Sequence, residues 1–172
     1  MDIGTLSAVL VLVEVAAVAF SIVLYLSRQT FEGAQVWIAG QAFMALGAAG
    51  LLFRAQLPWL VALVLANLPF IAASVCFMHS LFVFRGYGRF PRWVYLSVAL
   101  VAILLSFDLS ENATYRSIVF SSSAALLNFA IAYISIRRQS EPYRLAASLL
   151  AAVFALTGGA NAIRAISLFG AA

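Results

Sequence analysis

The sequence contains no lysine, a single cysteine and a single histidine, and these shortages exclude several kinds of site. Without a lysine the chain cannot form a Schiff base, which excludes a retinal chromophore attached to the protein. One cysteine, Cys76, permits neither an intramolecular disulfide nor a cysteine-rich metal site. Because Cys76 lies in an apolar run, we expect it to act as small apolar filler. A bis-histidine haem needs two histidines, and His79 has no counterpart.

Charged residues are also scarce, at 9% of the 172 residues, whereas 65% of residues are apolar and the mean hydropathy is +1.07. No water-soluble domain of this size needs so much apolar surface. No polar stretch is long enough to form a separate soluble domain. We therefore expect residues 1–172 to form a single integral-membrane helical domain, in the inner (plasma) membrane of the cell, with the lipid bilayer as its surroundings and no cofactor.

Apolar runs divide the chain into about six candidate transmembrane spans. Most of them have the roughly 20 residues needed to cross a hydrocarbon core of about 30 Å. Lipid offers no hydrogen-bond partner to an exposed backbone, so spans of this kind must be helices, and the predicted fold class is an all-α polytopic bundle. The third span contains Pro69, a natural point for a bend, and the fourth span is short. The spans lie near residues 5–26, 34–53, 57–84, 93–107, 117–136 and 145–169.

Arginine placement predicts the orientation of the chain. Seven of the ten arginines occur in one alternating set of loops and three in the other, so the first set is predicted to be cytoplasmic and the N-terminus to lie outside. Arg85, Arg89 and Arg92 cluster in one cytoplasmic loop around a turn at Gly86-Tyr87-Gly88. Each arginine there gains about 1 kcal/mol from anionic lipid. Anionic lipid or a protein partner is the predicted contact of this loop, and nucleic acid is not needed to explain the charge.

Four polar residues fall near the middle of the predicted spans: Glu14, Asn67, Asn128 and Thr157. Buried polar groups usually face the interior of a membrane bundle, so a shared intramembrane polar site is one interpretation. The plainer one is that the amides and hydroxyls form hydrogen bonds between helices, worth about 0.6 to 2 kcal/mol each. Glu14 differs, since a lone acid at that depth is either protonated or bound to something. We expect it to face spans three and five, near Asn67 or Asn128.

Two further groups of residues have a structural interpretation and a functional one. His79, near the cytoplasmic end of the third span, could titrate or bind a ligand, but hydrogen bonding to a neighbouring helix explains it as well. Glycines in the second and sixth spans are predicted to permit close helix packing rather than to bind a substrate: Gly40, Gly47, Gly50, Gly158 and Gly159.

Short motifs in the first 90 residues resemble the multi-span membrane domain at the N-terminus of bacterial diguanylate cyclases of the GGDEF type. The motifs are an arginine in the first loop, Trp37-Ile38-Ala39-Gly40, Leu51-Leu52-Phe53-Arg54 followed by Leu57-Pro58, Asn67, and Phe84-Arg85-Gly86. The resemblance implies signal reception in the membrane. No GGDEF segment is present, so the chain is either a fragment or a free-standing relative that contacts another protein.

These observations favour a sensory or regulatory membrane module without catalytic activity of its own. Its ligand is not identified, and its expected partner is another membrane protein or a second copy of the chain. An accessory subunit of a larger membrane complex is the first alternative, and a small transporter is the second. The transporter ranks last because the one repeat that the sequence suggests, a weak match of Arg28-Gln29 to Arg138-Gln139 that Ala- and Leu-rich helices also produce by chance, is parallel and not inverted.

Overall fold

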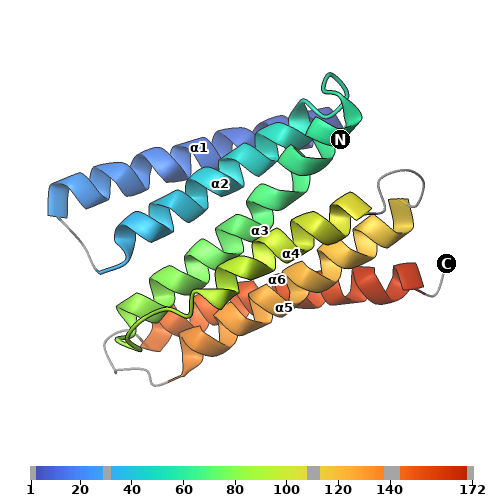
Figure 1. Cartoon of the computed structure of the whole chain (residues 1–172). Coiled ribbons are helices and arrows are strands. Elements are labelled where there is room, and N and C mark those ends of the chain that lie inside the picture. Colours follow the sequence, from blue (N-terminus) through green and yellow to red (C-terminus); the bar gives the residue numbers. More distant parts are fainter. Residues whose placement is uncertain (1–2, 29–31, 108–112, 138–143, 170–172) are drawn as a thin grey trace. The chain divides into compact units, whose positions relative to one another are not determined.

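The computed structural model describes residues 3–28, 32–107, 113–137 and 144–169, and these segments form six α-helices without a β-strand (Figure 1). The described residues between the helices form turns and bends. The helices are α1 (Ile3–Arg28), α2 (Ala34–Leu52), α3 (Trp59–Phe84), α4 (Trp93–Phe107), α5 (Ala113–Ile136) and α6 (Arg144–Phe169).

The helices confirm the predicted polytopic helical fold, with boundaries within four residues of the predicted spans. Five of them, α1, α2, α3, α5 and α6, are long and apolar enough to cross a membrane. Helix α4 has 15 residues, which at about 1.5 Å per residue gives about 22 Å, less than the thickness of a hydrocarbon core. Its short length was already evident in the sequence.

The chain divides into two compact units, residues 1–98 and 99–172, with the division inside α4. In the first unit, α1 packs on α2 and α2 packs on α3. In the second unit, α5 packs on α6. Each unit is therefore built on helices that are neighbours in the sequence.

Glycines bring α2 and α3 into close contact. A methyl group added at Gly40 would lie 2.7 Å from the ring of Phe77, and one added at Gly47 would lie 2.9 Å from the ring of Phe70. Both the glycines and the phenylalanines are seven residues apart, so each ring fills the space above one glycine, as expected for two helices packed lengthwise. The prediction that these glycines serve packing is confirmed.

The closest approach of the two helices lies at Gly50. A methyl group there would lie 2.5 Å from the carbonyl carbon of Leu65 and 2.9 Å from the backbone nitrogen of Ala66. Pro69, inside α3, has no N–H with which to bond the carbonyl of Leu65. The backbone of α2 at Gly50 therefore lies against this carbonyl.

In the second unit, the buried residues of α6 form a stripe of small side chains, consisting of Ala147, Ala151, Gly158 and Ala165. A methyl group at Gly158 would lie 3.1 Å from the ring of Phe129 in α5, so this glycine also serves packing. Gly159 has nothing within 4 Å of the same position, and there the packing prediction is wrong. Ser121, Asn128 and Ser135, spaced by seven residues along α5, are all buried, so they lie on one face of this helix.

Helix α1 is the least covered of the long helices. None of its described side chains is buried, and large apolar residues such as Leu12, Phe20 and Leu26 are more than 60% exposed. Its half-buried residues include Glu14, Val18, Ser21 and Tyr25, which recur every three or four positions. Because α1 packs on α2, this stripe is the side that meets α2.

Candidate functional site

The three predicted intramembrane amides and hydroxyls use their donors within their own helices. Asn67 Nδ2 donates to the carbonyl of Leu63 at 2.7 Å, and Asn128 Nδ2 donates to the carbonyl of Ala124 at 2.7 Å. Thr157 Oγ1, on an exposed side chain, donates to the carbonyl of Val153 at 2.9 Å. Each acceptor is four residues earlier, a bond that a polar side chain can make on any helix. The prediction that these donors link different helices is wrong.

Glu14 is half-buried on the stripe of α1 that meets α2. Within the part of the chain that the structure describes, its carboxyl group forms no hydrogen bond or ion pair. Asn67, its expected neighbour in the first unit, is half-buried and bonded to Leu63. The structure therefore gives no bonded polar site that joins Glu14 to Asn67, and Asn128 and Thr157 belong to the second unit.

His79 takes part in an aromatic cluster with Phe90 and Tyr95. Its Nδ1 is hydrogen-bonded to the Tyr95 hydroxyl, and its ring stacks on Phe90 with the centroids 4.5 Å apart and the planes at 18°. Phe90, which is buried, also meets Tyr95 and Phe82 edge-on, with centroids 5.5 Å and 5.6 Å away. The predicted hydrogen bond from His79 to a neighbouring helix, α4, is confirmed. We refer to His79, Phe90 and Tyr95 below as the aromatic cluster.

The aromatic cluster holds the loop that carries the predicted contact arginines. Gly86 and Gly88 have φ angles of 65° and 85°, a left-handed conformation that suits glycine and confirms the predicted turn. Arg85 ends α3 and is half-buried, whereas Arg89 and Arg92 are exposed. Arg89 and Arg92 are therefore exposed, on a loop that packs against α3 through Phe90.

A second tight contact on α3 lies one residue from His79. Gly33, before α2, has a φ angle of 95°, and its carbonyl accepts hydrogen bonds from Ser80 Oγ at 2.9 Å and from the backbone N–H of Trp37 at 3.0 Å. A methyl group at Gly33 would lie 2.9 Å from the carbonyl oxygen of Ser80. Only glycine suits both the conformation and the space, so the turn before α2 presses directly on α3.

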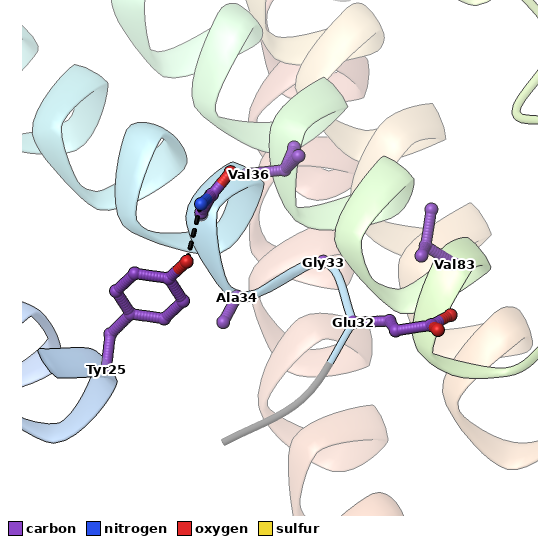
Figure 2. Close-up of a pocket in the computed structure, with 7 residues that line it drawn as sticks. Tyr25, Glu32, Gly33, Ala34, Val36 and Val83 are labelled. Atoms are coloured by element: carbon purple, nitrogen blue, oxygen red, sulfur yellow. Dashed lines mark hydrogen bonds between the residues drawn. The ribbon is translucent and has the colours of Figure 1, made fainter. Parts of the chain in front are cut away.

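This turn forms one wall of an open pocket of about 400 Å³ (Figure 2). The pocket lies at the end of the first unit where α1 ends, α2 begins and α3 ends. It is lined by Tyr25, Glu32, Gly33, Ala34, Gln35, Val36 and Val83. We call it the end pocket. Its volume is within the range of pockets that take small molecules.

The polar groups of the end pocket lie on two sides of the turn. Figure 2 shows the Tyr25 ring on the side of α1 and the Glu32 carboxylate beside Val83 of α3. Gln35 Nε2 donates to the Tyr25 hydroxyl at 2.5 Å. Glu32 is exposed, and no hydrogen bond or ion pair engages it among the described residues. Ala34, Val36 and Val83 supply apolar surface between these polar groups.

None of the pocket's polar residues was predicted from the sequence. The available signal was modest: Glu32 is one of only six acidic residues, and it lies in a short loop between two apolar runs with Gln35 just after it. An acidic residue in a loop is ordinarily a solvated surface group. The left-handed turn at Gly33 is what carries Glu32 to α3, and no pattern in the sequence specifies that contact.

Comparison with family models, with characterised proteins and with solved structures finds no match to this chain. Any functional conclusion therefore depends on the residues themselves. In the described segments, no three histidine, cysteine, aspartate or glutamate side chains are grouped so that they could hold a metal ion.

Proposed function

We propose that the chain is a sensory or regulatory module of the inner (plasma) membrane, without catalytic activity of its own. The end pocket receives the signal, and the loop from Arg85 to Arg92 delivers it to anionic lipid or to a partner protein. The observation that carries this proposal is that residues of the pocket and residues of the loop both contact the last two turns of α3. The resemblance of the first 90 residues to membrane domains of GGDEF-type cyclases agrees with such a role.

The connection consists of direct contacts. Gly33 and Val83 line the pocket, and the carbonyl of Gly33 accepts the hydrogen bond of Ser80. The adjacent residue, His79, contacts Phe90 and Tyr95 on another face of α3. A ligand that shifts the backbone at Gly33 therefore changes the packing of the last two helical turns of α3, which also contact the loop. If this end of α3 has two discrete packing arrangements, a shift between them provides a physical means of signalling.

An experiment on the full chain in lipid nanodiscs tests this connection. The native Cys76 is replaced by alanine, and a spin label is attached at Arg89→Cys in the loop. Ser80→Ala removes the bond to Gly33, and we expect it to raise the mobility of the label. The control is Ser167→Ala, because Ser167 is an exposed residue of α6 whose one hydrogen bond to a described residue goes to the carbonyl of Ile163 in its own helix. Equal mobility in the Ser80 variant and the control would mean that pocket and loop are uncoupled.

The accessory-subunit alternative is favoured by one feature, the exposure of α1. A helix whose described side chains are all half-buried or exposed, with a half-buried acid at mid-length, is suited to lie against another protein in the membrane. Under this alternative, the full chain co-purifies with a partner from its native membrane, and substitutions along the exposed face of α1, such as Leu12→Trp, release that partner. Under the sensory proposal, they leave the loop mobility unchanged.

A further inference from the structure

We propose that the end pocket binds a small amino alcohol group, in which an ammonium is separated by a short carbon chain from an oxygen that accepts a hydrogen bond. This inference rests on the proposed function, because it names the ligand class of the same pocket. The shared chemistry occurs in two sources, free ethanolamine-type amines and the phosphoethanolamine headgroup of a membrane lipid. The argument depends on two side chains, Glu32 and Tyr25.

Glu32 supplies the attraction for the ammonium. Among the described residues that line the end pocket, it is the only charged one. Figure 2 shows its carboxylate beside Val83 of α3, and the other described residues that line the pocket are uncharged. A carboxylate with open acceptor positions binds an ammonium through charge-assisted hydrogen bonds. The same charge repels an anion that lacks an amine.

Tyr25 supplies the donor for the ligand's oxygen. Its hydroxyl oxygen accepts the bond from Gln35 Nε2. The hydroxyl proton is then left to donate, and no described residue accepts it. The bond from Gln35 also fixes where the hydroxyl lies. Since Tyr25 and Glu32 are on two sides of the turn, a ligand that satisfies both must carry its oxygen and its ammonium at different ends.

The size and lining of the pocket fit this class of ligand. A volume of about 400 Å³ accommodates a headgroup, and Ala34, Val36 and Val83 can cover its methylene groups. The pocket is open and lies at the end of apolar helices of membrane-spanning length, at the level where lipid headgroups meet water. Both a soluble amine and a lipid headgroup can therefore reach it.

Binding is measured on the full chain in nanodiscs of phosphatidylglycerol, a lipid without an amine, by saturation-transfer NMR with ethanolamine and with ethylamine. Ethylamine keeps the ammonium and lacks the oxygen. We expect Glu32→Gln to weaken the binding of both amines by about tenfold or more, as for the loss of a charge-assisted contact. Tyr25→Phe is expected to weaken the binding of ethanolamine by about threefold, because it removes one neutral hydrogen bond. The binding of ethylamine, which makes no such bond, should be unchanged. Asp108→Asn, which removes an acid from the second unit of the chain, is the control.

A second arm distinguishes the sources. In nanodiscs that contain phosphatidylethanolamine, native mass spectrometry counts the lipids retained by the chain, and the headgroup source predicts that Glu32→Gln loses the retained amine lipid. Binding of ethanolamine that depends on both Glu32 and Tyr25, or retention of the amine lipid that depends on Glu32, supports the inference, whereas ethylamine bound as tightly as ethanolamine would overturn the role of the oxygen. Equal behaviour of Glu32→Gln and Asp108→Asn in both arms overturns it. Amine binding together with an unresponsive loop would instead refute the proposed sensory function, and a coupled loop without amine binding would refute only the ligand class.

Discussion

Replacing Gly50 by alanine tests the close approach of α2 and α3, on which the architecture of the first unit depends. The new methyl group would lie 2.5 Å from the carbonyl carbon of Leu65 and 2.9 Å from the nitrogen of Ala66. Carbon atoms in contact are ordinarily about 3.5 to 4.0 Å apart, so the overlap with Leu65 is about 1 Å. Both neighbours are backbone atoms of a helix and cannot rotate away. The helices must separate, which also loosens Phe70 and Phe77 above the other two glycines.

The size of the effect follows from two opposing contributions. Overpacking costs about 1 to 3 kcal/mol, and backbone obstruction at Gly50 places this case at the upper end. Alanine gains back up to about 1 kcal/mol over glycine as a helix former. We therefore expect Gly50→Ala to lower the free energy of unfolding by about 2 kcal/mol, measured by denaturant titration in detergent micelles with circular dichroism.

Gly159→Ala is the matched control, because it makes the same exchange on a membrane-length helix with nothing within 4 Å of the new methyl group. It is expected to leave the protein as stable as before or to stabilise it by up to about 1 kcal/mol. If Gly50→Ala were as stable as Gly159→Ala, the close approach of α2 to the carbonyl of Leu65 would be refuted, and with it the packing of α2 on α3 at this point.

Three other predictions concern orientation and polar groups. A membrane-impermeant thiol reagent added from outside should label Asn112→Cys and spare Arg89→Cys. The reason is that the high arginine density around Arg89 predicts a cytoplasmic position for the loop from Arg85 to Arg92. Glu14→Leu should be at least as stable as Glu14→Gln in the same unfolding assay, since no described group bonds the carboxyl and a leucine suits a membrane span better. Ser121→Ala should be neutral or stabilising by up to about 1 kcal/mol, because its buried hydroxyl has no described partner, whereas Ser80→Ala should cost about 1 kcal/mol.

Each of these predictions has an outcome that contradicts it. Labelling in the reverse order would invert the predicted topology. A Glu14→Leu variant that unfolds more easily than Glu14→Gln would restore the idea of an internal polar site around this acid. If Ser121→Ala lost as much stability as Ser80→Ala, the Ser121 hydroxyl would have a partner that the structure lacks.

The helices of this chain could be predicted from sequence because one physical quantity, the transfer of apolar segments out of water, sets their length and position. Glycine packing was predictable for a related reason, since a glycine that recurs every seven residues on one helix leaves a groove for a neighbour. At Gly159 the same composition misled, because the residue following a packed glycine points about 100° away from it.

The polar residues were harder to interpret, because depth in the membrane does not specify a partner. Depth alone predicts that Asn67 and Asn128 bond across helices, yet each has a backbone acceptor four residues earlier on its own helix, and that bond can form on any isolated span. The end pocket was missed since it depends on the turn at Gly33, where a single left-handed residue decides which side of α3 the loop meets. Such contacts between distant residues have no periodic pattern in the sequence.

The central claim, that a ligand in the end pocket alters the basic loop, is tested most directly by the spin label at Arg89→Cys in the full chain. We expect ethanolamine, or phosphatidylethanolamine in the nanodisc, to change the mobility of the label. The change should be absent in Glu32→Gln, which cannot bind the ammonium, and in Ser80→Ala, which binds it but lacks the bond to Gly33. An unchanged spectrum in the unsubstituted pocket, under conditions where NMR or mass spectrometry shows the amine bound, would contradict the account.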